Sequence, residues 1–158
     1  PPRSTLFPYT TLFRSGDRAE NILFRLQHGE LEDTTPKVVV ALLGINNLAM
    51  GNTPGEAALG VALVLRKLRT KVPKAKILLL GVFPTKKAED EARVREVNDY
   101  LEKMDDGKTI RYLNINDRFL GKDGKLRQDL FRDAVHLSRK GYVLWGESTT
   151  AAVKALMK

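Results

Sequence analysis

Three short apolar runs, separated by amphipathic stretches, constrain the fold of this chain more than any other feature. The runs are Val38–Leu43, Lys76–Gly81 and Ile110–Ile115. Continuous apolar runs of this length are typical of strands that are buried on both faces of a parallel sheet. The stretches between them carry apolar residues at helical spacing, so strands and helices alternate. This alternation predicts an α/β fold with helices on both faces of a parallel sheet, joined by right-handed crossovers.

The expected helices have recognisable ends. Gly29 is a stop for a first helix, and Thr53, Pro54 and Glu56 form a capping box for a second. The inward face of the second helix is expected to hold Leu59, Leu63, Val64 and Leu68. A third helix is expected over Ala88–Met104, with Val94, Val97, Leu101 and Met104 inward. Ser138 is expected to cap a last helix that packs on the sheet through Tyr142, Trp145, Val153 and Leu156.

Composition narrows the classes of function. The 158 residues fit one domain, and no stretch approaches the ~20 apolar residues that cross a bilayer. The chain has no cysteine and two histidines, which argues against a metal site. The net charge of +8 is scattered rather than gathered, so we expect no nucleic-acid partner.

The most informative polar pair is Asp133 with His136, three residues apart near the end of the chain. An imidazole is the usual general base at neutral pH, and a neighbouring carboxylate can orient it. Such a pair normally serves a serine nucleophile. Asn46 and Asn47 follow the first apolar run and are either turn residues or functional donors. His28 falls in the last turn of the first helix, where a structural role is expected.

Residues 5–15 do not fit the pattern of the rest of the chain. They read as the translation of a widely used sequencing-library adapter, and such scars are set aside before fold reasoning. We therefore expect a non-native segment over residues 1–15 and a single domain over residues 16–158. The alternative is a natural apolar strand at the N-terminus.

Four blocks together carry a family resemblance: Gly16–Leu26, Gly29–Glu32, Gly44–Asn47 and Asp133–Leu137. In this order and spacing the chain resembles the GDSL-type, or SGNH, ester hydrolases. Within them it is similar to the catalytic subunits of intracellular platelet-activating-factor acetylhydrolase and their bacterial acetylesterase relatives. The resemblance implies a flavodoxin-like, three-layer αβα fold whose intact sheet has five parallel strands in the order 2-1-3-4-5.

The resemblance also implies roles for four residues. Gly16 matches the glycine whose backbone N–H points into the oxyanion hole, and Asn46 matches the asparagine that donates there. His136 matches the general base, and Asp133 matches the carboxylate that orients it. The family's mechanism needs no metal and no cofactor.

The sequence departs from the family at the nucleophile. The Gly-Asp of this chain is followed by Arg18 where the family's first block has serine, and the downstream helix identifies it as the second block. Ser4 and Ser15 lie in the adapter-like segment, while Ser138 and Ser148 are expected to be helix residues. The nucleophile block is therefore expected upstream and missing here, along with the first strands of the sheet.

Two consequences are expected. About three parallel strands would remain, and Val38–Leu43 would present an open apolar edge, which favours aggregation or a partly molten state. The leading function is a serine ester hydrolase acting on small acyl groups such as acetyl, weakly active or inactive as written, with a possible homodimer when intact. The alternative is a non-catalytic binding or dimerisation module. A nucleotide-binding domain ranks lower because no phosphate-binding glycine loop follows any strand.

Overall fold

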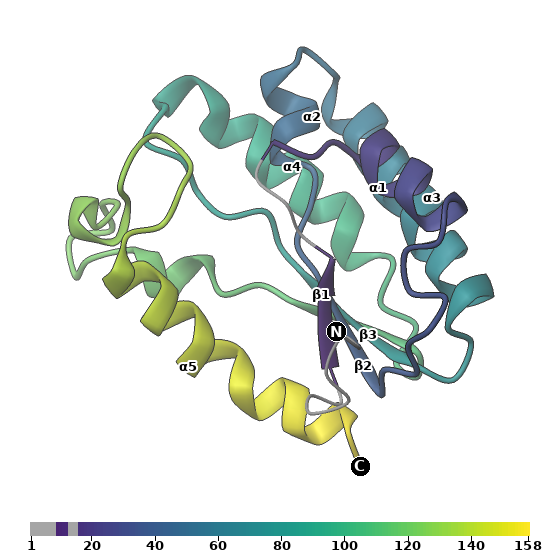
Figure 1. The fold of residues 1–158 in the computed structure, drawn as a ribbon. Helices are drawn as coiled ribbons and strands as arrows, with labels where there is room; N and C mark the ends of the chain where they lie inside the picture. The colour runs from purple at the N-terminus through teal and green to yellow at the C-terminus, as the bar shows by residue number, and fades with distance from the viewer. Residues whose placement is uncertain (1–8, 13–15) are drawn as a thin grey trace.

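The computed structural model describes residues 9–12 and 16–158, and it places one parallel sheet at the centre of the molecule. The strands are β1 (Tyr9–Leu12), β2 (Val38–Ala41), β3 (Lys76–Leu80) and β4 (Ile110–Leu113). They lie side by side in the order β1-β2-β3-β4, each parallel to its neighbour (Figure 1). The three apolar runs predicted as strands are confirmed as β2, β3 and β4.

Strand β1 corrects two expectations. The sheet has four strands instead of about three, and β2 has no open edge, because β1 pairs with it from Tyr9↔Val38 to Leu12↔Ala41. An unpaired strand edge offers a row of N–H and C=O groups to any extended segment. Here that segment comes from the residues set aside as adapter-like, so the open edge on which the expected insolubility depended is absent.

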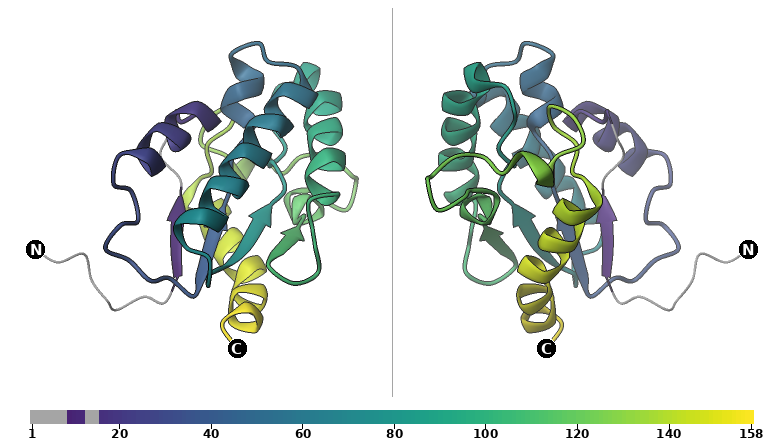
Figure 2. Two further views of the ribbon diagram at one scale, coloured as in Figure 1. Left: turned by 90° about the vertical axis from the view of Figure 1, so that its right-hand side faces the viewer. Right: turned by 90° about the vertical axis from the view of Figure 1, so that its left-hand side faces the viewer.

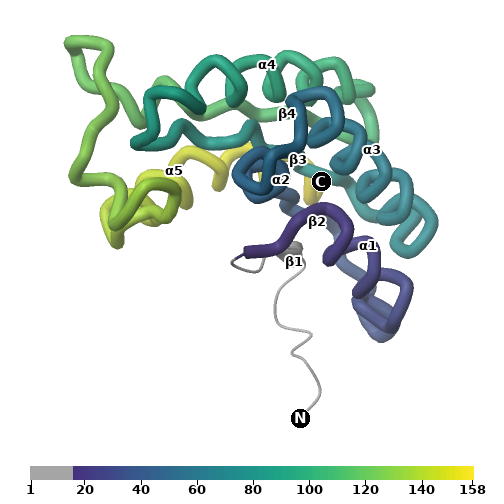
Figure 3. The backbone as a smooth tube through the Cα atoms, turned by 90° about the horizontal axis from the view of Figure 1, so that it is seen from above, coloured from purple at the N-terminus to yellow at the C-terminus, as the bar shows by residue number. Residues whose placement is uncertain are grey.

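Helices cover the two faces of the sheet unequally. The helices α1, α3 and α4 lie on one face, and α5 lies alone on the other (Figures 1 and 3). This arrangement confirms the three-layer α/β fold. The helices are α1 (Ala19–Gln27), α2 (Ile45–Ala49), α3 (Pro54–Lys71), α4 (Glu91–Glu102) and α5 (Arg139–Leu156), with 3-10 turns η1 (Ala88–Asp90), η2 (Asn116–Phe119) and η3 (Gln128–Leu130).

Alternate residues of β2 and β3 serve opposite faces of the sheet, as the pleat of a strand requires. This makes two cores, one under the three helices and one under α5, with Phe119 and Phe131 filling the second. Apart from Lys76 at the start of β3, both strands are therefore apolar throughout. Val39, Ala41, Ile77 and Leu79 belong to the first core, and Val38, Val40, Leu78 and Leu80 belong to the second.

The capping box of α3 is confirmed. The backbone N–H of Glu56 donates to Thr53 Oγ1 at 3.2 Å, and the N–H of Thr53 donates to Glu56 Oε2 at 2.8 Å. One residue of its predicted inward face was wrong, because Leu59 is 61% exposed. The buried stripe of α3 is set by Ala57, Val61, Val64 and Leu68, and a residue two positions after Ala57 points away from it.

The remaining helix predictions hold with two corrections. Ser138 caps α5, accepting from the N–H of Gly141 at 3.3 Å, and Trp145 packs into the second core. Tyr142 is 47% exposed, so its expected packing on the sheet was wrong. The third helix runs from Glu91 to Glu102 rather than from Ala88 to Met104, and Ala88–Asp90 forms a 3-10 turn before it. In the described part of the chain, no helix has the length and hydropathy needed to cross a membrane.

Candidate active site

Asp133 and His136 are hydrogen-bonded to each other in the loop between η3 and α5. His136 Nδ1 lies 2.9 Å from Asp133 Oδ1 and 3.0 Å from Oδ2. The same carboxylate accepts the backbone N–H of His136 at 2.8 Å and that of Val135 at 3.1 Å. These hydrogen bonds, first that from the His136 backbone, hold the pKa of Asp133 well below its usual range. The carboxylate is therefore ionised at neutral pH and faces the imidazole.

The loop that carries the pair closes on itself. Phe131 and Leu137 form an antiparallel bridge, and the N–H of Arg132 donates to the carbonyl of His136 at 2.8 Å. Phe131 and Leu137 are also buried in the second core. The base of the loop is thus fixed in hydrocarbon, while the His136 side chain above it remains 35% exposed.

Lys86 fastens this loop to the sheet, a role that no sequence pattern indicated. Its backbone N–H donates to the carbonyl of Ala134 at 2.9 Å, and its Nζ donates to the carbonyl of Phe131 at 3.2 Å. Lys86 follows β3, so these two bonds link the carboxyl edge of the sheet to the residues on either side of Asp133.

Gly16 and Asn46 come from segments that are in direct contact. Gly16 has φ +84°, a left-handed conformation that suits glycine. Asn46, in the first turn of α2, donates from Nδ2 to the carbonyl of Asp17 at 2.8 Å. The side chain of Asn46 therefore reaches the residue next to Gly16.

Asn47 has a different role from Asn46. It is buried, and its Oδ1 accepts the backbone N–H of Ala19 at 3.0 Å. Its Nδ2 lies within hydrogen-bonding distance of Glu20 Oε2, at 3.1 Å, and of Asn52 Oδ1, at 3.3 Å. Asn47 thus joins the start of α1 to α2. Both asparagines make hydrogen bonds within the chain, with separate partners, and a functional donor role for Asn46 stays a prediction.

Arg93, on α4, forms hydrogen bonds to the main chain of α2 and of the loop that follows it. Its Nη2 donates to the carbonyl of Leu48 at 3.0 Å and to that of Asn52 at 2.8 Å, while its Nη1 lies 3.1 Å from Asp90 Oδ1. No pattern in the sequence distinguished this arginine from its neighbours on α4. It fixes the helix that presents Asn46.

The two halves of the predicted site lie at the same end of the sheet. The carboxyl ends of the strands, α2 and the loop before α5 share one end of the molecule (Figure 2). A cavity of about 50 Å³ lies between them and is lined by Ile45, next to Asn46, and by Val135, next to His136. Its other lining residues are Leu42, Leu43, Val82, Phe83, Pro84 and Thr85.

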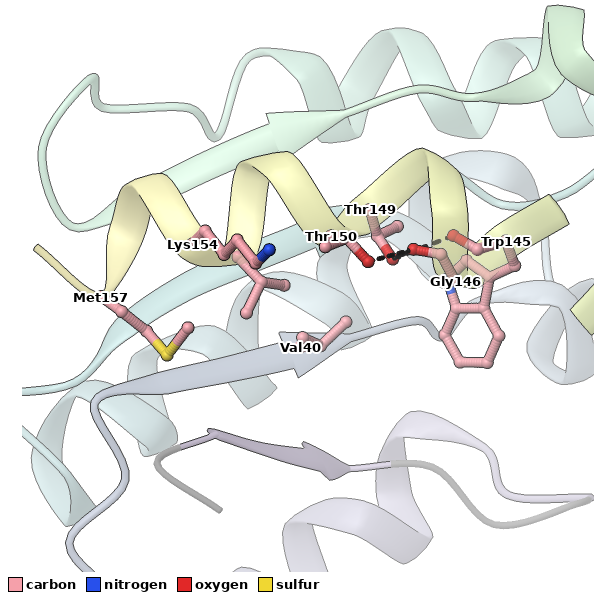
Figure 4. A pocket seen from close by; sticks show the side chains of 8 residues that line it. Val40, Trp145, Gly146, Thr149, Thr150, Lys154 and Met157 are labelled. Carbon is pink, nitrogen blue, oxygen red and sulfur yellow. Dashed lines mark hydrogen bonds between the residues drawn. The ribbon is translucent and has the colours of Figure 1, made fainter. Parts of the chain in front are cut away.

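A second pocket, of about 340 Å³, lies between β2 and α5 (Figure 4). Its described lining is Val40, Trp145, Gly146, Thr149, Thr150, Val153, Lys154 and Met157. Gly16, Asn46, Asp133 and His136 are absent from both linings, but the smaller cavity is lined by direct neighbours of two of them, Ile45 and Val135, and the second pocket is not.

The two serines of the described residues belong to α5, Ser138 as its N-cap and Ser148 within the helix, and both hydroxyls donate to main-chain carbonyls. Ser138 Oγ donates to the carbonyl of Asp129 at 2.7 Å, and Ser148 Oγ donates to that of Leu144 at 2.7 Å. Both expectations for these serines are confirmed, whereas Ser4 and Ser15 lie outside the described residues. Across residues 16–158, no group of three or more His, Asp or Glu side chains could hold a metal ion.

His28 fills the structural role that was expected of it. It is the C-cap residue of α1, with Nδ1 2.7 Å from the carbonyl of Phe24 and its ring stacked on the Phe24 ring at 3.9 Å. Within the described residues, the histidine whose ring nitrogen lies against a carboxylate is His136, with Nδ1 2.9 Å from Asp133 Oδ1.

Known proteins with similar sequences are hydrolases. The chain is 34% identical over 131 residues to platelet-activating factor acetylhydrolase IB subunit alpha2 of Rattus norvegicus, covering 80% of this chain and 56% of that protein. The corresponding protein of Gallus gallus is 32% identical over 130 residues, with the same coverage. The chain thus spans about half the length of the curated relatives it matches.

Solved structures show the same fold. A GDSL-like lipase from Bacteroides thetaiotaomicron aligns with a TM-score of 0.72 at 18% identity, covering 89% of this chain and 73% of that one. A carbohydrate esterase family 3 protein from Talaromyces cellulolyticus aligns with a TM-score of 0.67 at 18% identity, covering 91% and 70%. The model of the GDSL-like lipase/acylhydrolase family matches residues 7–144. The chain therefore belongs to the GDSL-like lipase/acylhydrolase family.

Proposed function

We propose that this chain is the part of a serine ester hydrolase that carries the catalytic histidine and the oxyanion hole, and that the enzyme acts on small acyl esters such as acetyl esters. The observation that carries the proposal is the contact between His136 Nδ1 and the Asp133 carboxylate. A carboxylate at Nδ1 fixes the imidazole tautomer and assigns proton transfer to Nε2. The names of the acetylhydrolase relatives favour a small acyl group.

The proposed reaction proceeds through an acyl-enzyme. A serine hydroxyl attacks the ester carbonyl while His136 takes its proton, and Asp133 stabilises the imidazolium that forms. The oxyanion accepts hydrogen bonds from the Gly16 N–H and the Asn46 amide. His136 then returns the proton to the leaving alcohol, and water releases the acid by the same steps in reverse. Loss of one oxyanion donor typically costs about 10²–10³ in rate.

The nucleophile is proposed to lie outside residues 16–158. In that range the two serine hydroxyls donate to main-chain carbonyls: Ser138, the N-cap of α5, to that of Asp129, and Ser148, within α5, to that of Leu144. A site without its nucleophile retains about 10³–10⁴-fold catalysis over water from binding and the oxyanion hole. We therefore expect weak hydrolysis by this chain.

Hydrolysis of p-nitrophenyl acetate tests the proposal. Where no serine is present, His136 can take the proton of a water that attacks the ester directly, so His136→Ala should lower the residual rate at least about tenfold. His28→Ala is the matched control, because it removes the other histidine from an exposed helix end. Equal rates for the two variants would reject the proposal and favour the alternative, a non-catalytic binding or dimerisation module.

A fluorophosphonate probe tests the location of the nucleophile. The probe phosphonylates an activated serine, and peptide mapping identifies the modified residue. We expect no stoichiometric label on the chain. Full labelling of any of its four serines would show that the nucleophile is present after all.

A further inference from the structure

The segment before α1 is held by an ion pair that the mechanism above does not use. Asp17 Oδ1 accepts from Arg25 Nη1 at 2.8 Å, and Oδ2 accepts from Nη2 at 2.7 Å. The two side chains are only 14% and 17% exposed, so water competes little for the pair. Glu30 lies 3.7 Å from Arg25 Nε and adds a second carboxylate. The hydrogen bonds to Asp17 raise the pKa of Arg25, so it stays charged.

Asp17 is held at its main chain as well as at its side chain. Its carbonyl accepts the Asn46 amide at 2.8 Å, while its carboxylate accepts the guanidinium of Arg25. One residue therefore links the first helix to α2, next to the proposed oxyanion glycine.

The space where a side chain of residue 16 would lie is open. A Cβ built on Gly16 would meet nothing within 4 Å, although its φ is +84°. The left-handed backbone is therefore not forced by a close neighbour at this position. The described contacts that can fix it are those of the next residue, Asp17.

We propose that the Asp17–Arg25 pair is a positioning device that aims the backbone N–H of Gly16 at the oxyanion. This inference rests on the proposed function, because it assumes that Gly16 is an oxyanion donor. Arg25 touches neither substrate nor reacting atoms, and it acts through Asp17. Because a misplacement of about 1 Å can cost about 10²-fold in rate, a remote pair of this kind matters to the site.

Binding of methylphosphonate, followed by ¹H–¹⁵N NMR, tests the inference. This tetrahedral anion resembles the intermediate of ester hydrolysis. In the unaltered chain, the Gly16 amide and the Asn46 side-chain amide should shift together. The Arg25→Lys variant keeps the positive charge but loses the bidentate contact with Asp17. We expect its affinity for methylphosphonate to fall about tenfold or more. Arg95→Lys, in an exposed pair with Glu91, is the control and should bind normally.

Asp17→Asn separates positioning from charge. This variant removes a negative charge near the anion, so electrostatics alone would strengthen binding. Positioning predicts the opposite, a weaker affinity for methylphosphonate, measured at a temperature at which the variant is still folded. If Arg25→Lys does not fold, Asp17→Asn decides the question.

The outcomes distinguish the two proposals. Shifts in the unaltered chain with unchanged affinity in the Arg25 and Asp17 variants would overturn the positioning role and leave the ester hydrolase proposal standing. Loss of the melting transition in both variants would make the pair purely structural. Absence of any shift in the unaltered chain would overturn the oxyanion hole, and both proposals with it.

Discussion

Asp133 accepts its hydrogen bonds from neighbours two and three residues ahead, and this makes its charge resistant to acid. An aspartate in an unfolded chain has a pKa of about 3.9. In the folded chain the pKa of Asp133 is lowered, so its contribution to stability is present above about pH 4 and is lost only as pH falls through the lowered value.

The prediction concerns the ionisation of Asp133 in acid. At about pH 3, below the unfolded pKa of about 3.9, the Asp133 carboxyl should still be ionised if the chain is folded. Carboxyl ¹³C NMR measures this directly, with the assignment made from Asp133→Asn. A midpoint at or above about 3.9 would contradict the lowered pKa.

At the scale of residues, local relations could be predicted and long-range ones could not. Asp133 and His136 lie three positions apart, so one turn brings them together, and their types indicate the chemistry. Lys86 reaches Phe131 across 45 residues, and nothing in its surroundings in the sequence marks that contact. The division of roles between Asn46 and Asn47 depends on which way each points from α2, which spacing does not fix.

Among the elements, α5 makes its closest approach through a glycine. A Cβ on Gly141 would lie 2.2 Å from the carbonyl oxygen of Leu130, whereas a Cβ on Gly146 would meet nothing within 4 Å. The two glycines lie in the same helix but differ in what faces them. Gly141 lets the first turn of α5 rest on η3, immediately beside the loop that carries His136.

The prediction is a pair of opposite effects. Gly141→Ala should destabilise the chain by about 1–3 kcal/mol or more, because main chain must move to admit the methyl group. Gly146→Ala should be neutral or stabilising by up to about 1 kcal/mol, because alanine favours a helix. Urea unfolding of the two variants and the parent chain measures both. Similar stabilities for the two variants would contradict the packing of α5.

The sequence predicted the start of α3 better than the ends of β2 and β4. The capping box placed the start of α3 correctly, because its signal is local hydrogen bonding. The predicted Val38–Leu43 strand stops pairing at Ala41, and Ile110–Ile115 stops at Leu113. Leu42 and Leu43 remain apolar because they line the small cavity beyond the strand. An apolar run indicates which residues are buried, but residues can be buried beyond the last hydrogen bond between strands, so the run does not mark where a strand ends.

For the whole molecule, β1 decides whether the sheet has a protected edge. All four residues of β2 are buried, so loss of β1 would expose the backbone of a fully apolar strand. The three-layer arrangement was predictable from alternation alone. The fourth strand was not, because its residues were read as an adapter and excluded from fold reasoning; the origin of residues 1–15 stays a prediction.

Deletion of residues 1–15 tests this role. The shortened chain should self-associate in light scattering and melt at a lower temperature, because the freed edge of β2 pairs with other copies. Deletion of residues 1–8 alone, which keeps β1, is the control and should behave like the parent. A monomeric chain from Gly16 onward with an unchanged melting temperature would show that β1 is dispensable.

The self-closed loop of Asp133 and His136 has a consequence for how the site can fail. Both partners lie on one short loop, so a variant that displaces the loop as a whole would leave their mutual contact intact while it changes their distances to Gly16 and Asn46. A variant can then lose turnover and still display a normal histidine signal. An intact contact between Asp133 and His136 therefore shows only that residues 133–136 are folded. Whether the proposed catalytic centre is assembled has to be measured at the proposed oxyanion donors, Gly16 and Asn46.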